Sequence, residues 1–256
     1  MSSNTATSHH EWETSWAPLV IAVGIFFTIP LAFSGYFQYE SLGMAILFLG
    51  IGVPVLLAGI ARWVTEGMAP HEGPHEIPKG LAISGLPIFI TSEVFIFLGI
   101  FVSYWALRLS AESWPPEGTP HIGLAIPVIM TIILVSSSFT FHFAEHKLEN
   151  GDHAGFKSLL LTTIALGVIF LGFTFYEYNH LLGGGFGPET NIYGSAFYSI
   201  TGFHAAHVLV GVGTFIAVLI PALGGKTNMT FVKCAGVYWH FVDIVWFFVV
   251  SQIYFW

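Results

Sequence analysis

Cysteine is almost absent from this chain, with Cys234 alone among 256 residues. A single cysteine excludes an internal disulfide, a four-thiolate metal site and a cysteine pair for dinuclear copper. Basic residues are scarce too, with 7 Lys and Arg against 15 Asp and Glu, so the sequence argues against a nucleic-acid partner. A strict alternation of apolar and polar residues is missing as well, which argues against a transmembrane barrel.

The composition is that of a membrane protein. Charged residues make up 9% of the chain and hydrophobic residues 54%, with a mean hydropathy of +0.74. Seven apolar segments are each long enough for a helix that crosses about 30 Å of hydrocarbon. They run over residues 16–37, 42–64, 81–109, 122–148, 156–182, 193–223 and 231–256. The sequence therefore predicts an all-α polytopic membrane protein with seven transmembrane helices, kinked where prolines fall within the spans.

The connections divide these segments into groups. Residues 1–15 form a polar tail, and 16–64 form a two-helix bundle. Residues 65–80 are a connecting loop rich in Pro and Gly, and 81–256 form a five-helix bundle. Basic residues predict the orientation, because they favour the inner side of a membrane. Arg108 adjoins an odd-numbered connection, whereas the other six flank even-numbered ones: Arg62, Lys79, Lys147, Lys157, Lys226 and Lys233. The N-terminus is therefore expected inside and Trp256 outside.

Polar residues within the spans are the candidate functional positions, because burying them in hydrocarbon is costly. Glu93 lies near the middle of the third span, and it either stays protonated or finds a histidine or lipid partner. His240 and Asp243 are three residues apart, so on a helix they share a face. Two interpretations remain open for them: a His–Asp hydrogen bond that joins two helices, or a ligand or proton site. His204 and His207 share a face of the sixth span, and Glu177 lies near the outer end of the fifth.

Two metal-binding hypotheses have a basis in the residues. His142, Glu145 and His146 form an H-x-x-E-H pattern, which is an inverted zinc-protease signature. Because this pattern falls in the last turn of a membrane helix, a polar helix end is the ordinary explanation. His204 or His207 together with His240 would also suit the axial ligation of haem b, although histidines at helix contacts are commoner.

Six stretches carry a resemblance to a known family. They are RWVTEG followed by PKGL (62–81), SEVFIFLGIFVSYW (92–105), WPPEGTPH (114–121), TIALGVIFLGFTFYEY (163–178), YGSAFYSITGFHAAHVLVG (193–211) and YWHFVDIVWFF (238–248). In this order and at this spacing they resemble subunit III of haem-copper oxidases, above all cytochrome c oxidase. Seven spans fit the long form of that family, and the first sixty residues match it weakly.

The resemblance implies a subunit without a redox centre of its own. It implies direct contact with the oxidase subunit I, which holds haem and copper, proximity to subunit II, and a possible place in a respiratory supercomplex. It also implies that the two-helix and five-helix bundles enclose a V-shaped cleft that holds phospholipid. Lipid-binding positions would be Arg62, Trp63, Glu66, His75 and Glu93. Buried polar and packing positions would be Glu177, His204, His207, Trp239, His240, Asp243 and Trp246.

The competing classes are a subunit III of a quinol oxidase, a haem b membrane anchor and a small-molecule transporter. The expected location is a bacterial plasma membrane, ahead of a mitochondrial inner membrane. With the N-terminus inside, many histidines fall on the inner face, where they would collect protons for uptake. The residues of this proton-antenna hypothesis are His71, His75, His142, His146 and His153. The alternative is that polar loops of this chain simply use histidine.

Overall fold

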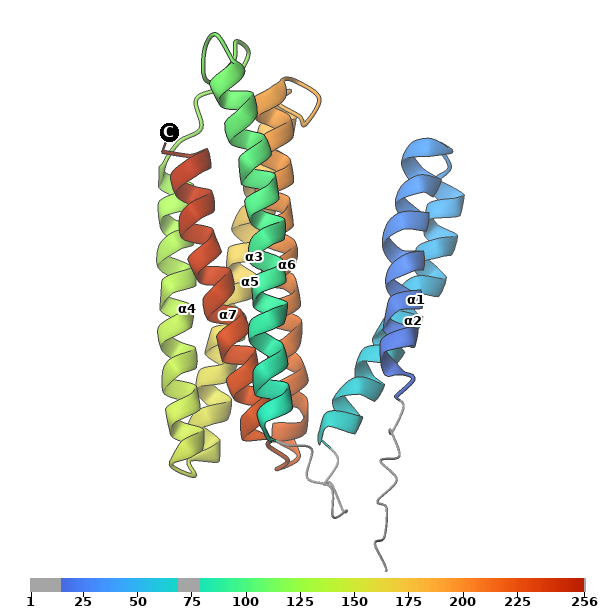
Figure 1. Ribbon diagram of the computed structural model, residues 1–256, viewed down its shortest axis with the longest axis vertical. Helices are drawn as coiled ribbons and strands as arrows, with labels where there is room; N and C mark the ends of the chain where they lie inside the picture. The colour runs from blue at the N-terminus through green and yellow to red at the C-terminus, as the bar shows by residue number, and fades with distance from the viewer. Residues whose placement is uncertain (1–14, 69–78, 256) are drawn as a thin grey trace, which may run out of the picture. The chain divides into compact units, whose positions relative to one another are not determined.

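The computed structural model describes residues 15–68 and 79–255 (Figure 1). All regular structure in these two ranges is helical, and seven helices are long and apolar enough to cross a membrane. The prediction of an all-α, seven-helix membrane protein is therefore confirmed, and the predicted segments agree with the helices to within a few residues. The chain divides into two compact units, Met1–Ala69 and Pro70–Trp256.

The first unit is a helical hairpin. Its first span consists of α1 (Ala17–Phe26) and two π-helical segments, η1 (Phe27–Leu31) and η2 (Ser34–Gln38), and its second span is α2 (Leu42–Met68). Pro30 lies in η1, where its missing N–H and its ring disturb the regular ladder, as expected for a proline within a span. Glycines allow the two spans to approach closely. A Cβ on Gly24 would lie 2.5 Å from the backbone of Leu56, and one on Gly59 would lie 2.9 Å from the backbone of Ile21.

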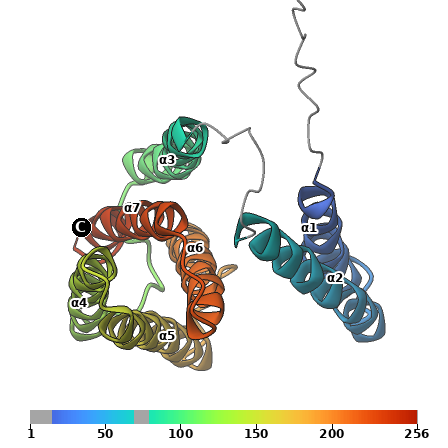
Figure 2. The ribbon, with the colours of Figure 1, turned by 90° about the horizontal axis from the view of Figure 1, so that it is seen from below.

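The second unit contains five helices. They are α3 (Lys79–Ser110), α4 (Ala125–Glu149), α5 (His153–Gly183), α6 (Ile192–Leu223) and α7 (Met229–Ile253). Helices α4 to α7 surround a common core, and α3 packs on the outside against α6 and α7 (Figure 2). Side-chain oxygens of Asp152, Asn191 and Asn228 accept backbone N–H groups at the starts of α5, α6 and α7.

The two ends of this unit differ in chemistry. One end carries the α4–α5 and α6–α7 connections with Lys147, Lys157, Lys226 and Lys233, and is called the lysine end below. The opposite end, called the tyrosine end, carries the connections at 111–124 and 184–191. There the hydroxyls of Tyr104 and Tyr193 donate to the backbone carbonyls of Gln252 and Ile253, each over 2.7 Å. These bonds satisfy carbonyls in the last turn of α7, which an α-helix leaves without an N–H partner of its own.

Trp239 of α7 fills the centre of the four-helix core and is fully buried. Its indole lies against Gly167 of α5 and Gly211 of α6, where a Cβ would come within 3.0 Å and 2.6 Å of the ring. The indole N–H donates to the Ser137 hydroxyl of α4 over 2.9 Å. One side chain thus contacts all three neighbouring helices and satisfies its only polar atom, as a buried indole requires. Trp246 repeats the pattern by donating to Thr131 of α4 over 2.9 Å.

Candidate functional site

Glu93 of α3 and His207 of α6 meet at the contact between these helices. The Glu93 Oε2 lies 3.0 Å from His207 Nε2, and the side chains are 15% and 12% exposed. His207 Nδ1 lies 2.8 Å from the Phe203 carbonyl. Because a carbonyl can only accept, Nδ1 carries a hydrogen, and the bond between Nε2 and Oε2 holds the remaining proton of the pair. A histidine or a lipid was the expected partner of Glu93, and the structure places His207 beside it.

A second polar group lies at the contact between α4 and α7. The Ser138 hydroxyl donates to Asp243 Oδ2 and lies 3.0 Å from His240 Nδ1. Asp243 is buried, and His240 and Ser138 are half-buried. The expected contact between His240 and Asp243 is thus bridged by a serine that the sequence did not single out. A serine within an apolar helix gives little signal, because it usually bonds to its own helix, as Ser136 does to the Ile132 carbonyl.

His204 occupies the interior of the bundle. It is fully buried, and its ring lies 5.0 Å from Trp246 and 5.8 Å from Phe170, measured between centroids. Neither ring nitrogen has a hydrogen-bond partner within the ranges that the structure describes. His204 therefore faces the core of α4 to α7, whereas His207, three residues later, faces α3. The haem hypothesis requires two of these histidines to face each other, but His207 contacts Glu93 and His240 contacts Ser138.

Glu177 lies near the tyrosine end of α5, as expected from its position in the sequence. It is buried and accepts a hydrogen bond of 2.6 Å from the Tyr254 hydroxyl. Burial raises the pKa of Tyr254, and the adjacent Glu177 carboxyl raises it further. The bond joins α5 to the end of α7, so this glutamate has a structural partner.

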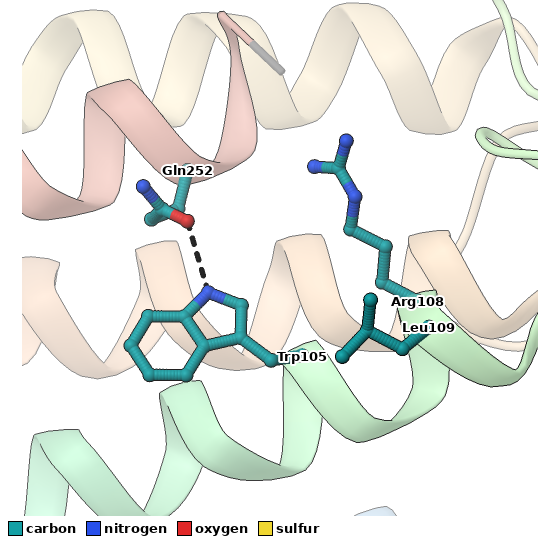
Figure 3. Close-up of a pocket in the computed structure, with 4 residues that line it drawn as sticks. All are labelled: Trp105, Arg108, Leu109 and Gln252. Carbon is teal, nitrogen blue, oxygen red and sulfur yellow. Dashed lines mark hydrogen bonds between the residues drawn. The ribbon is translucent and has the colours of Figure 1, made fainter.

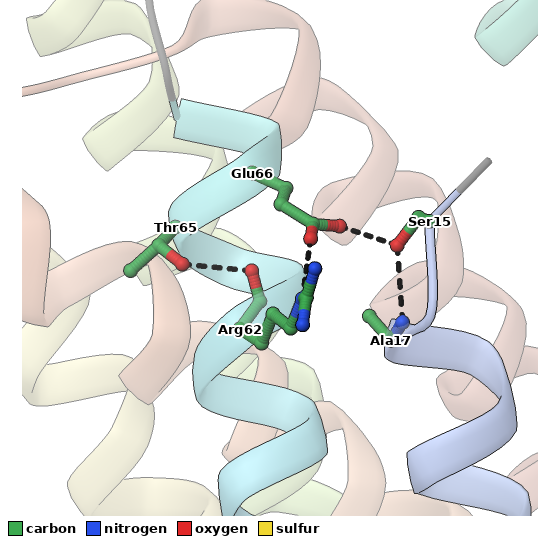
Figure 4. Close-up of polar contacts among 5 residues, drawn as sticks. All are labelled: Ser15, Ala17, Arg62, Thr65 and Glu66. Atoms are coloured by element: carbon green, nitrogen blue, oxygen red, sulfur yellow. Dashed lines mark hydrogen bonds and ion pairs between the residues drawn. The ribbon is translucent and has the colours of Figure 1, made fainter. Parts of the chain in front are cut away.

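The predicted lipid-binding residues of the first unit lie in the last turns of α2. The Arg62 Nε–H donates to Glu66 Oε1 over 2.7 Å, and the Ser15 hydroxyl also donates to Glu66 (Figure 4). Trp63 is 48% exposed. Glu66 takes one of the five N–H donors of the Arg62 guanidinium, so the group retains donors for a phosphate. His75, the other predicted residue of this region, lies outside the described residues.

The histidines of the antenna hypothesis separate into two sets. His142, His146 and His153 are exposed at the lysine end of the second unit. His71 and His75 lie outside the described residues. The structure therefore brings three of the five together on one end of the bundle.

Two carboxylates at the lysine end form ion pairs with lysines. Lys147 Nζ lies 3.0 Å from Asp152 Oδ2, and Lys233 Nζ lies 2.9 Å from Glu149 Oε1. The Gly155 N–H bond and the neighbouring Lys147 ammonium hold the pKa of Asp152 below its usual value. Asp152 therefore stays charged at neutral pH.

Sequence reasoning missed a pocket at the tyrosine end. It is open, measures about 400 Å³, and is lined by Trp105, Arg108, Leu109 and Gln252 (Figure 3). Trp105 donates to the Gln252 side chain over 2.9 Å, which joins α3 to the end of α7. Arg108 lies 5.9 Å from the Trp114 ring, within cation–π range. The available signal was Arg108 itself, which sequence reasoning used for orientation alone.

The zinc hypothesis concerned His142, Glu145 and His146. Within residues 15–68 and 79–255, no three His, Cys, Asp or Glu side chains form a group that could hold a metal ion. His142 and His146 are exposed near the ion pairs of the lysine end, in the surroundings of an ordinary polar helix end.

Comparison with known proteins identifies the family. The family model described as cytochrome c oxidase subunit III matches residues 7–256. A cytochrome c oxidase subunit 3 from Synechocystis is 40% identical over 207 residues, which cover 78% of this chain and 87% of the relative. The protein of that name from Thermostichus vulcanus is 38% identical over 70% of this chain and 89% of its own length. The one from Formosania lacustris is 33% identical over 99% of both chains. This seven-helix, multi-pass membrane protein therefore belongs to the cytochrome c oxidase subunit III family.

Proposed function

We propose that this chain is the subunit III of a terminal haem-copper oxidase of the cytochrome c oxidase type, and that it has no redox centre of its own. It would bind subunit I directly, lie close to subunit II, and support assembly, lipid binding and proton uptake while its partners reduce oxygen. The family match over residues 7–256 carries this proposal. Haem and copper would reside in the partner subunits.

Two alternatives remain testable. A quinol oxidase would use the same kind of subunit with another electron donor. A haem b anchor would need His240 to leave Ser138, and with His207 as the second ligand it would also need His207 to leave Glu93. Purification of the chain with its native partners, followed by haem analysis of each subunit, tests all three. A Soret band that stays with the isolated chain would favour the anchor and contradict the proposal.

The proposed orientation puts the N-terminus and the lysine end of the five-helix unit inside a bacterial plasma membrane. The distribution of basic residues supports it, because Arg108 alone adjoins an odd-numbered connection. The histidines and carboxylates of the lysine end would then face the side from which an oxidase takes up protons.

The proposed lipid role rests on Arg62, Trp63, Glu66, His75 and Glu93. Arg62 would bind the phosphate, Glu66 would keep the guanidinium in position, and the exposed Trp63 would lie at the level of the headgroups. Phospholipid should therefore remain bound to the purified oxidase. Arg62→Gln should lower the lipid content measured by mass spectrometry, whereas Lys157→Gln, which removes a charge in the other unit, should not. Equal lipid content in both variants would contradict the assignment.

The proposed proton role rests on exposed histidines at the lysine end. His142, His146 and His153 are exposed at the end of the bundle that also carries the carboxylates of Glu149 and Asp152. Removal of the chain from the oxidase should slow turnover chiefly at high pH, where bulk protons are scarce. Replacing the three histidines with Gln should reproduce part of this loss without reducing assembly. A pH–activity profile that is unchanged when the whole chain is removed would leave a purely structural role.

A further inference from the structure

Polar side chains follow one another along the contact between α4 and α7, which we call the α4–α7 seam. Ser138, His142, Glu145 and Glu149 of α4 are spaced by four, three and four residues, so they lie along one face of that helix. Lys233, His240 and Asp243 run along α7 with spacings of seven and three residues. The Glu149–Lys233 ion pair joins the two rows at the lysine end, and Ser138 joins them again at His240 and Asp243. The two helices therefore share a polar seam rather than isolated polar residues.

The seam reaches the middle of the membrane. Ser138 is eleven residues from Glu149, which at 1.5 Å per residue corresponds to roughly 16 Å along α4. That is about half of a hydrocarbon core about 30 Å thick. Between these two points, His142 and Glu145 lie on the same face of α4 as Ser138. Ionisable groups thus connect the lysine end to a polar site at mid-membrane depth.

The hydrogen bonds at Ser138 have a defined direction. The Ser138 hydroxyl donates its hydrogen to Asp243 Oδ2, so towards His240 its oxygen acts as the acceptor. His240 Nδ1, 3.0 Å away, must then be the donor. The chain of bonds runs from an imidazole N–H through a hydroxyl to a carboxyl group. Both of its ends are ionisable, and the group between them can accept one proton while giving up another.

Burial limits the charge that this site can hold. Asp243 is 6% exposed, and its Oδ1 has no hydrogen-bond partner among the described residues. A net charge in such surroundings is costly, whereas a neutral pair is tolerated. Two arrangements are neutral: an imidazolium beside a carboxylate, or a neutral imidazole beside a carboxylic acid. They differ only in the position of one proton.

The other neighbours of α7 bring four ionisable side chains near it. Besides α4, this helix packs against α3 and α6, and Trp239 and Trp246 also contact α5. The four side chains are Glu93, Glu177, His204 and His207, and Glu177 is bonded to Tyr254 at the end of α7. His207 contacts Tyr238 of α7, and His204 contacts Trp246. On α4, the ionisable side chains that share the face of Ser138 are His142, Glu145 and Glu149.

We propose that Asp243, Ser138 and His240 form a proton-storage site that is filled from the lysine end through His142 and Glu145. Filling begins with a neutral imidazole beside the carboxylate, and a proton that arrives through His142 and Glu145 binds His240 Nε2. The imidazolium Nδ1 then gives its proton to Ser138 Oγ while the Ser138 hydroxyl proton passes to Asp243 Oδ2. The product is a neutral imidazole and a carboxylic acid, and the hydroxyl is regenerated. The use of this site by an oxidase rests on the proposed function, but the existence of the site does not.

Infrared difference spectroscopy of the intact complex tests the proposal. Between about pH 5 and about pH 8, the range in which histidine exchanges its proton, a carboxylic-acid band should change together with the imidazole bands of labelled histidine. The carboxylic-acid band should be absent in Asp243→Asn. In Ser138→Ala the Asp243 carboxyl and the His240 imidazole should titrate at separate pH values. Ser138→Thr, which restores a hydroxyl, should bring the two titrations back to the same pH.

Ser136→Ala is the matched control, because Ser136 lies two residues away on α4 and bonds to its own helix. Coupled titration that survives Ser138→Ala, or that is lost equally in Ser136→Ala, would overturn the proposal. If Asp243→Asn fails to assemble, the serine variants decide, since they keep both ionisable groups. If Ser138→Ala loses the coupling but turnover is unchanged, the storage site is supported and its proposed role in proton uptake is contradicted.

Discussion

The contact between Gly211 and Trp239 yields the sharpest prediction about the bundle. A Cβ added at Gly211 would lie 2.6 Å and 2.7 Å from two carbons of the Trp239 ring. Favourable contacts between carbon atoms occur at about 3.5–4.0 Å, so either the ring or α6 must move by about 1 Å. The ring has little freedom, because its N–H is bonded to Ser137 and its other edge lies against Gly167. Gly211→Ala should therefore overpack the core.

The expected magnitude follows from a comparison with a neighbouring glycine. A Cβ at Gly213, two residues further along α6, would have no atom within 4 Å. Both Gly→Ala changes gain the same helix propensity, about 1 kcal/mol at most, so this contribution cancels in the difference between them. What remains is the cost of overpacking, about 1–3 kcal/mol. Gly211→Ala should thus be less stable than Gly213→Ala by a factor of roughly 5 to 150 in the unfolding equilibrium.

A titration of each purified variant with SDS in mixed micelles, followed by circular dichroism, measures this difference. Trp239→Phe supplies the second arm of a double-mutant cycle, because a smaller ring should relieve the clash with the new methyl group. The combined cost in Gly211→Ala, Trp239→Phe should then be smaller than the sum of the single costs by about 0.5–3 kcal/mol. Equal stability of Gly211→Ala and Gly213→Ala, or additive costs in the cycle, would refute the packing argument.

Three further predictions concern polar groups and orientation. Glu93→Gln should assemble normally, because an amide N–H can still donate to His207 Nε2. Glu93→Leu should reduce assembly, as measured by co-purification with the partner subunits. If Glu93→Gln reduces assembly as much as Glu93→Leu, the charge of Glu93 is required. The depressed pKa of Asp152 means that its contribution to stability is present above the unfolded pKa and is lost as the pH falls through the lower folded value. Acid unfolding should reveal this loss in the wild type, and Asp152→Asn, which keeps an acceptor for Gly155 N–H, should remove the pH dependence but not the cap. A cysteine introduced at 182–191 should react with an impermeant reagent from the outer side, and labelling confined to the inner side would reverse the topology.

Hydropathy predicted the helices well because lipid imposes a simple requirement on length and apolar content. The predicted segment 42–64, for example, became α2 (Leu42–Met68). Which face of a membrane helix meets protein is much harder to predict, because lipid and protein interiors are equally apolar. The sequence predicts that Glu93 either stays protonated or finds a histidine or lipid partner. It does not indicate which histidine, because His207 lies 114 residues away on a helix whose apolar residues favour no one face.

Two other features escaped prediction for physical reasons. Ser138 resembles any other serine in an apolar helix until α7 supplies two partners for its hydroxyl. His204 and His207 were expected to share a face, yet their angular offset on the helix is enough for one to enter the core and the other to meet α3. Spacing along one helix constrains which residues are neighbours, but the partner helix decides which of them is buried.

The recess that receives Trp239 also has a consequence for biosynthesis. Its two glycine walls belong to α5 and α6, which precede α7 in the chain. While α5 and α6 are already in the bilayer and α7 is still being synthesised, that recess is open to acyl chains, which are as apolar as the indole. Insertion of α7 must therefore displace lipid from between the two helices before the indole can reach Ser137. The docking of α7 is thus an exchange of lipid for tryptophan, and its rate should depend on how readily the acyl chains of the host membrane leave a narrow groove.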